Sequence, residues 1–181
     1  MSLRLPRILP PLLCLFLLSC GGRPAPPRAF TGAAACAECH GGPDGGQVQE
    51  SWQGTAHARA WTDLAGVRGA EVAREMGLAG DPQIAAQCLE CHSTGHGVPA
   101  SLKGALPVAE GVSCEACHGA GADYIKKLVM PDPRQARSAG LNPEPRRACQ
   151  GCHREGVAHI RPFKYEERWP VIAHRLPPRK K

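Results

Sequence analysis

Four short strings in the sequence share the pattern Cys-x-x-Cys-His, in which two thiols are followed directly by an imidazole. They read CAECH at residues 36–40, CLECH at 88–92, CEACH at 114–118 and CQGCH at 149–153. Two cysteines at this spacing reach two neighbouring vinyl groups of one porphyrin, and the next histidine is placed to bind the iron. The pattern therefore predicts four covalently bound c-type haems. The predicted attachment residues are Cys36, Cys39, Cys88, Cys91, Cys114, Cys117, Cys149 and Cys152, and the predicted proximal iron ligands are His40, His92, His118 and His153.

Three other kinds of site use paired cysteines, and each leaves part of this pattern unexplained. Disulfides form in exported proteins, but they need no histidine after each pair. Zinc sites built from four thiolates would also leave the four histidines without a role. A thioredoxin-like redox pair requires a βαβ context, and the sequence shows none. Haem attachment accounts for both the cysteines and the histidines of the motifs.

Two histidines outside the motifs are expected to bind iron from the opposite, distal face. His57 lies in SWQGTAHARAW, where small residues on a predicted helix would let a porphyrin approach the backbone. Its alternative role is a surface histidine on an amphipathic helix. His174 follows the apolar run WPVIA, which an exposed tail would not need. We therefore expect His57 and His174 to be distal ligands.

Two further residues, His96 and Met130, are weaker candidates for iron binding. His96 is too close to His92 to reach the other face of the same iron, so it either serves another haem or hydrogen-bonds a propionate or a bound ligand. Met130, in KKLVM, offers a thioether that raises the potential of a haem, with ordinary packing as its alternative role. His159 lies six residues after His153 and is expected not to bind iron.

The N-terminus has the features of an export signal. Arg4 and Arg7 precede an apolar run at residues 12–18, which is too short to span a membrane as a helix. The run ends in LLSC, which is typical of a bacterial lipobox with Cys20 as the lipidated mature N-terminus; a plain secretory signal cut after Ser19 is the alternative. The expected location is the periplasmic side of a bacterial membrane, anchored by the lipid. The expected segments are a signal peptide (1–19), a Pro/Gly-rich tether (20–30) and one haem domain (31–181).

The composition leaves little material for an ordinary core. Aromatic residues make up 4% of the chain, whereas there are 21 glycines and 18 prolines. Four porphyrins would supply the missing apolar bulk, so the chain is expected to fold only with its haems. The formal charge of +6 falls close to zero once the signal peptide is removed and each ferric haem adds about one negative charge. We therefore expect no nucleic-acid partner.

The elements that must position these residues are predicted to be helices and loops. Residues 47–76 have the best helical spacing, broken around Gly66 and Gly69. Residues 123–129 are expected to form a short amphipathic turn or helix. Short helices are expected at 135–139, where Gly140 is the stop signal, and at 166–174, with a loop at 95–112. No segment has a strand pattern. The predicted fold class is mainly α with extensive loops, a small multihaem cytochrome c fold wrapped round four haems.

The flanking sequences of the motifs resemble those of the tetrahaem cytochrome c554 family. The matching strings are CAECH followed by SWQGTAHARA, then CLECHSTGHG, EGVSCEACHGAGADY and CQGCH, over residues 36–153. The closing FKYEERWPVIAH resembles the C-terminal segment of a bacterial subgroup of this family. The resemblance implies a helical fold with closely packed haems, and electron transfer from hydroxylamine oxidation toward quinone or cytochrome partners.

The resemblance also implies a set of ligands. Three haems would have two histidine ligands each, and the second haem, held by His92, would be five-coordinate. His57 would bind the iron of the third haem opposite His118. The sequence lacks the family's histidines after the third motif and before the fourth, so we expect Met130 to serve the first haem and His174 the fourth.

The expected function is that of an exported, lipid-anchored tetrahaem electron carrier. Its partners would be other cytochromes or quinone-linked oxidoreductases. One alternative is a haem enzyme whose open second iron reduces nitric oxide, nitrite or peroxide, with His96 as the acid or base. Another alternative is a structural or sensory haem lipoprotein.

Overall fold

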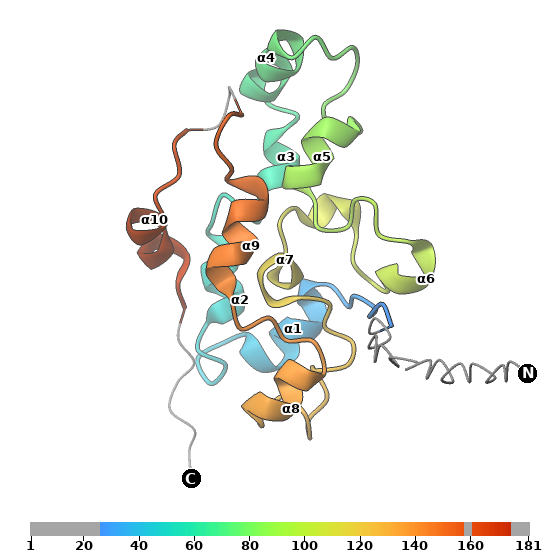
Figure 1. Cartoon of the computed structure of the whole chain (residues 1–181), viewed down its shortest axis with the longest axis vertical. Helices are drawn as coiled ribbons and strands as arrows, with labels where there is room; N and C mark the ends of the chain where they lie inside the picture. The colour runs from blue at the N-terminus through green and yellow to red at the C-terminus, as the bar shows by residue number, and fades with distance from the viewer. Residues whose placement is uncertain (1–25, 158–160, 175–181) are drawn as a thin grey trace, which may run out of the picture.

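The structure is a computed structural model, and it describes residues 26–157 and 161–174. These residues form short helices joined by turns, with no strand among them (Figure 1), which confirms the predicted fold class. No helix in these ranges is long and apolar enough to cross a membrane. The helices are α1 (Ala33–His40), α2 (Val48–Gln53), α3 (Ala60–Asp63), α4 (Val67–Glu75), α5 (Ala86–His92), α6 (Ala100–Lys103), the 3₁₀ helix η1 (Val108–Glu110), α7 (Cys114–His118), α8 (Pro133–Ser138), α9 (Pro145–Cys152) and α10 (Tyr165–Ile172).

Each of the four motifs forms the C-terminal end of a short helix. Helices α1, α5 and α7 end at the motif histidine itself, and α9 ends one residue before His153. In a helix, residues three apart lie on the same face. Both cysteines of a motif therefore point to one side, as attachment to a single porphyrin requires.

The motif helices pack in an order that differs from their order in the chain. Helix α1 contacts α7, α7 contacts α9, and α9 contacts α5. Figure 1 shows α7 and α9 in the middle of the molecule, with α1 and α5 toward opposite ends. The motifs therefore follow one another in space as first, third, fourth and second.

One prediction about the helices was wrong, because His57 lies in a turn. Helix α2 ends at Gln53, and turns at residues 54–59 precede α3. Gly54 caps α2, and the Thr55 hydroxyl donates to the Trp52 carbonyl oxygen at 2.7 Å. These bonds end the helix four residues before His57.

The other predicted helices agree with the structure to different degrees. The helix expected at 135–139 is α8, whose N-terminal amides Arg134 and Gln135 donate to the Asp132 carboxylate. The last expected helix is α10, which includes Pro170. Residues 123–129 form turns, and the loop at 95–112 contains α6 and η1. The turns at 123–129 fit the expected turn or helix, whereas α6 and η1 were missed because they are only four and three residues long, too short for periodicity to decide.

The apolar core of the described residues is small. Its largest fully buried apolar side chain is Leu106, which is 1% exposed. Half of the buried apolar residues are alanines, so side chains alone remove little apolar surface from water. The buried apolar residues are Ala33, Ala60, Leu64, Ala73, Leu89, Leu106, Tyr124 and Ala136.

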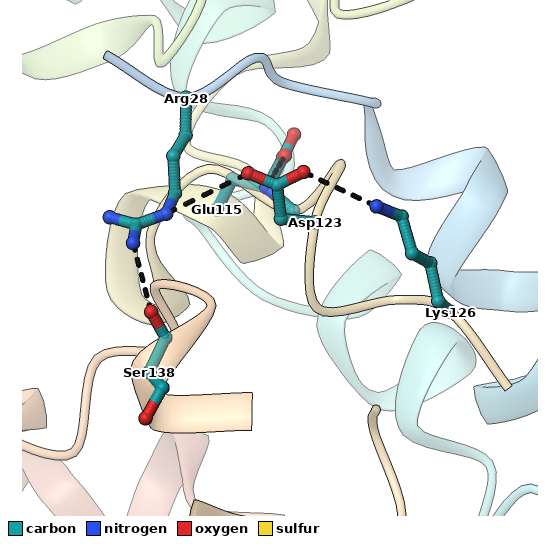
Figure 2. Close-up of polar contacts among 6 residues, drawn as sticks. Arg28, Glu115, Asp123, Lys126 and Ser138 are labelled. Atoms are coloured by element: carbon teal, nitrogen blue, oxygen red, sulfur yellow. Dashed lines mark hydrogen bonds and ion pairs between the residues drawn. The ribbon is translucent and has the colours of Figure 1, made fainter. Parts of the chain in front are cut away.

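The residues just before α1 are bound to the body of the protein. Phe30 donates its amide to the Leu102 carbonyl, and the Ala29 carbonyl accepts from the amide of Ala122. Arg28 donates to the Ser138 carbonyl at 2.9 Å, and its Nε lies 3.8 Å from a carboxylate oxygen of Asp123 (Figure 2). Residues 28–30, which we expected in the tether, are thus held by α6, α8 and the segment after α7. The expected signal peptide and Cys20 lie outside the described residues.

A buried carboxylate ties the third motif to the start of the first. Glu115, the second residue of CEACH, is 2% exposed. It accepts hydrogen bonds from the amides of Thr31 (3.0 Å), Gly32 (2.9 Å) and Gly121 (2.6 Å). The bonds fix the N-terminus of α1 against α7 and so position the first motif beside the third.

Candidate haem-binding site

Two cavities bring the residues of the four motifs together in pairs. The first cavity, of about 240 Å³, is lined by Cys36 and His40 from the first motif and by Cys114, Cys117 and His118 from the third. The second cavity, of about 490 Å³, is lined by Cys91 and His92 from the second motif and by Cys149, Cys152 and His153 from the fourth. The fold therefore brings together motifs that are 78 and 61 residues apart in sequence, counted from Cys36 to Cys114 and from Cys88 to Cys149.

The two cavities adjoin. Four residues line both of them: His57, Val112, Cys117 and Ile172. Groups bound in the two cavities would be separated by side chains of these residues and not by a whole helix.

The cysteines form a nearly continuous series along the motif helices. A hydrogen bond between the thiols of Cys36 and Cys114 lowers the pKa of Cys36 and raises that of Cys114. Burial, followed by the charge of Cys149, raises the pKa of Cys117. Burial and the neighbouring Cys91 raise the pKa of Cys152 to about 11.

The state of the cysteines fits haem attachment better than the alternatives. All eight motif cysteines are free of disulfides. In the described part of the chain, no three histidine, cysteine or acidic side chains gather as a bare metal ion would need. Paired thiols beside a cavity and an imidazole suit a porphyrin.

The motif histidines are prepared to act as neutral ligands. Burial lowers the pKa of His40, His118 and His153 below the ordinary value of 6.5, so their imidazoles keep a free lone pair at neutral pH. The Nδ1 of His92 lies 2.7 Å from the Ala60 carbonyl oxygen. As a donor to that oxygen, Nδ1 carries the proton and leaves Nε2 for iron.

Two of the candidate distal ligands face motif histidines across the cavities. The ring centroid of His57 lies 6.0 Å from that of His153, and the rings are inclined by 70°. The ring centroid of His174 lies 5.9 Å from that of His118, at an angle of 53°. Burial and the charge of His153 lower the pKa of His57. Both candidates are thus placed beside predicted iron positions, and their binding to iron stays a prediction.

The remaining candidates divide between the cavity and the rest of the molecule. Met130 lines the first cavity together with His40. His96 is not among the residues that line either cavity, and its amide donates to the Ser93 carbonyl. His159 lies outside the described residues. Of the two weaker candidates for distal ligation, the structure therefore places only Met130 at a site.

Several cavity residues were not found from the sequence. Phe163 stacks on the His153 ring with centroids 4.5 Å apart and an angle of 18°. Arg161 and Arg168 line the second cavity and place cations where porphyrin carboxylates could bind. The clustered aromatic and basic residues of RPFKYEERW are the signal that could have pointed to them.

Comparison with known proteins agrees with this arrangement. The sequence model of a family described as "Cytochrome c554 and c-prime" matches residues 35–119, which include the first three motifs and His57. Cytochrome c-554 of Nitrosomonas europaea is 33% identical over 114 residues, which cover 61% of this chain and 46% of that protein. The chain is thus similar to the cytochrome c554 family in sequence over its first three motifs, and in fold over most of its length. Members are c-type cytochromes, so covalently bound haem is the cofactor of this chain.

A solved structure shows the same fold. The chain superposes on the reduced state of cytochrome c554 from Nitrosomonas europaea with a TM-score of 0.54 and 23% sequence identity. The match covers 81% of this chain and 79% of that one. The matched sequence spans about half the length of the curated cytochrome c-554.

Proposed function

We propose that the protein is an exported, lipid-anchored cytochrome that carries four haems and transfers electrons between redox proteins in the periplasm. The observation that carries this proposal is the contact series α1, α7, α9 and α5, which places the four motifs side by side. Electron transfer falls off steeply with distance, so adjacent cofactors conduct where isolated ones do not. When bound, the haems supply the one-electron chemistry, and the chain supplies their order and spacing.

The side chains at the cavities have three tasks in this function. Cysteine pairs fix each porphyrin, and neutral imidazoles hold each iron from one face. His57, Val112, Cys117 and Ile172 form the wall common to both cavities and keep water out of the gap between the two haem pairs. Arg161 and Arg168 offset the negative charge of porphyrin carboxylates in the second cavity.

Mass spectrometry and rapid mixing of the purified holo-protein test the carrier function. We expect a mass increase of four haems and reduction of all four by a small reduced cytochrome in stopped-flow absorbance. A protein with fewer haems would contradict the count. Haems that exchange electrons with no soluble cytochrome and no quinol-linked reductase would favour a structural or sensory role.

The lipid anchor has a separate test with a matched control. Cys20→Ser should release the cytochrome from the membrane fraction and remove labelling by a radioactive fatty acid. Cys14→Ser, inside the expected signal peptide, should leave both unchanged. A cytochrome that fractionates as a soluble protein before either change would contradict the anchor.

A second function, reduction of a small nitrogen oxide or peroxide, is supported by one observation. The second cavity contains three histidines, His57, His92 and His153, for the two irons of the second and fourth motifs. One of these irons is therefore short of a second imidazole from this cavity. Carbon monoxide binding by the native ferrous protein, followed by turnover of nitric oxide, nitrite or peroxide, would support this function. Absence of any ligand binding would exclude it.

A further inference from the structure

The two histidine pairs across the cavities have the separation of two ligands on one iron. A metal–imidazole bond is about 2 Å long, and the ring centre lies about 1.1 Å beyond the nitrogen, so two axial imidazoles have centroids roughly 6 Å apart. His118 and His174 lie at 5.9 Å, and His57 and His153 at 6.0 Å. Each pair joins a motif histidine to a histidine from a distant part of the chain.

These pairs exchange the roles that family resemblance implies. The resemblance assigns His57 to the iron of His118, and it leaves His174 for the iron of His153. In the structure, the ring opposite His118 is that of His174, and the ring opposite His153 is that of His57. We propose that His174 is the sixth ligand of the third iron and His57 the sixth ligand of the fourth. The proposal rests on the four-haem function argued above.

The C-terminal helix explains how His174 reaches the first cavity. Residues Tyr165 and Trp169 of α10 line the second cavity, and Ile172 at its end lines both. The chain then crosses to the first cavity, which His174 lines. Helix α10 thus runs over the fourth motif and delivers its histidine to the third.

Contacts with α9 hold α10 in this course. Arg146 of α9 pairs with the Glu166 carboxylate and lies over the Tyr165 ring, 4.5 Å from its centroid. Tyr165 in turn stacks on Trp169 at 5.5 Å. These contacts align the helix along the second cavity, so the residues after it are directed toward the first.

The backbone around His57 directs this residue to the second cavity. Its carbonyl oxygen accepts the Val112 amide at 3.0 Å, and the indole of Trp52 donates to the Val112 carbonyl at 2.9 Å. These bonds hold the turn in the wall between the cavities, where the His57 ring borders both. On the far side, the stacked Phe163 ring orients His153.

His40 is the main competitor for His174. The charge of His174 lowers the pKa of both His118 and His40, so both lie within electrostatic range. The ring contact is made with His118. Met130 remains in the first cavity for the iron of His40.

The first experiment compares His174→Ala with His96→Ala in the ferric holo-protein. Mass spectrometry must show four haems in both variants; failure at this step counts against the four-haem function and not against the ligand pairing. By electron paramagnetic resonance, His174→Ala should convert one of the low-spin haems to high-spin. His174→Met should restore a low-spin signal and raise the potential of that haem. His96→Ala should match the wild type, because His96 lines neither cavity.

The second experiment identifies which iron each histidine serves. In a variant without the third haem, Cys114→Ala with Cys117→Ala, adding His174→Ala should change no further haem, whereas adding His57→Ala should still convert one. If His174→Ala still converts a haem in this background, the proposal is overturned. A crystal structure of His174→Ala with cyanide gives the same answer independently of that background. Cyanide on the iron of His118 supports the proposal, and cyanide on the iron of His40 or His153 overturns it.

Discussion

At the scale of single residues, three motifs carry glutamate between their cysteines, but only one of these carboxylates holds the fold together. Glu38 in CAECH and Glu90 in CLECH are exposed, whereas Glu115 in CEACH is buried. Glu115 accepts three backbone amides from two segments outside its own helix. Glu115 is the second residue of its motif, whereas Glu38 and Glu90 are the third residues of theirs. One position along a helix turns a side chain to another face, so Glu115 meets a different neighbour.

Replacing Glu115 should cost far more stability than replacing its counterparts. Glu115→Ala leaves the amides of Thr31, Gly32 and Gly121 buried without an acceptor, and each such group costs about 1–3 kcal/mol. We expect the free energy of unfolding of the holo-protein to fall by roughly 3 kcal/mol or more. Guanidinium unfolding monitored by far-ultraviolet circular dichroism measures this free energy. Glu38→Ala and Glu90→Ala should change it by less than about 0.5 kcal/mol. Similar losses in all three variants would contradict the role of Glu115.

Glu110 provides a prediction about pH. One of its carboxylate oxygens accepts the Ala33 amide at 3.0 Å, and the other is buried without a partner. Burial, with the nearby charge of Glu115 adding to it, raises the pKa of Glu110 above 4.5. Above pH 4.5 the folded state therefore holds this proton more tightly than the unfolded state, so stability falls as the pH rises toward neutrality.

Glu110→Gln should remove that pH dependence. The amide oxygen can still accept the Ala33 amide, and no charge is buried. We expect the variant to be more stable than the wild type at pH 7, by less than about 1 kcal/mol because solvent partly screens the carboxylate. The advantage should disappear near pH 4, where the wild-type carboxyl is protonated. Unfolding curves at the two pH values measure this, and a constant difference between them would contradict it.

At the scale of elements, the turn that carries His57 depends on a glycine in another segment. Gly111 follows η1 with φ +76°, and a Cβ at this position would lie 2.8 Å from the His57 carbonyl oxygen and 2.9 Å from that of Ala58. Only glycine allows this close approach. The approach permits the bond from the Val112 amide that holds the turn.

Gly111→Ala should therefore disturb a haem as well as the fold. Its matched control is Gly77→Ala, where φ is +69° and no atom lies within 4 Å of the added Cβ. The control should lose about 1–2 kcal/mol from backbone strain alone and keep the wild-type electron paramagnetic resonance spectrum. Gly111→Ala should lose more and should convert part of one low-spin haem to high-spin. Identical spectra for the two variants would show that the approach of Gly111 does not position His57.

The sequence predicted those elements that local chemistry determines. Covalent attachment requires the spacing Cys-x-x-Cys-His, so the motif residues could be read directly, and the end of α8 was visible in the signal of Gly140. The interruption of the helix at Gly54 was missed because the apolar spacing of residues 47–76 continues through it. The sequence could not predict which motifs share a cavity or which histidines face each other. Both depend on contacts between distant segments, such as α7 with α9 and Tyr165 with Arg146.

At the scale of the whole molecule, the motif helices form a series with unequal positions. The third motif, on α7, contacts both α1 and α9, whereas the second, on α5, contacts α9 and the small helix α3. The third motif also provides Glu115, and its Cys117 lines both cavities. The third motif is thus internal to the series, and the second is terminal.

Removal of single haems should reveal this difference. Cys114→Ala with Cys117→Ala eliminates the third haem, and Cys88→Ala with Cys91→Ala eliminates the second, so each variant keeps three haems by mass spectrometry. Because apolar side chains bury little surface here, loss of the internal haem exposes the walls of both cavities and should lower the melting temperature by more than loss of the terminal one.

The internal deletion also interrupts the series between the first motif and the fourth. In stopped-flow experiments, the haems of the internal-deletion variant should therefore be reduced in a fast and a slow phase. The terminal-deletion variant should keep three connected haems, which should be reduced in a single phase. Equal melting temperatures and equal kinetics in the two variants would show that the order first, third, fourth and second does not govern stability or electron transfer.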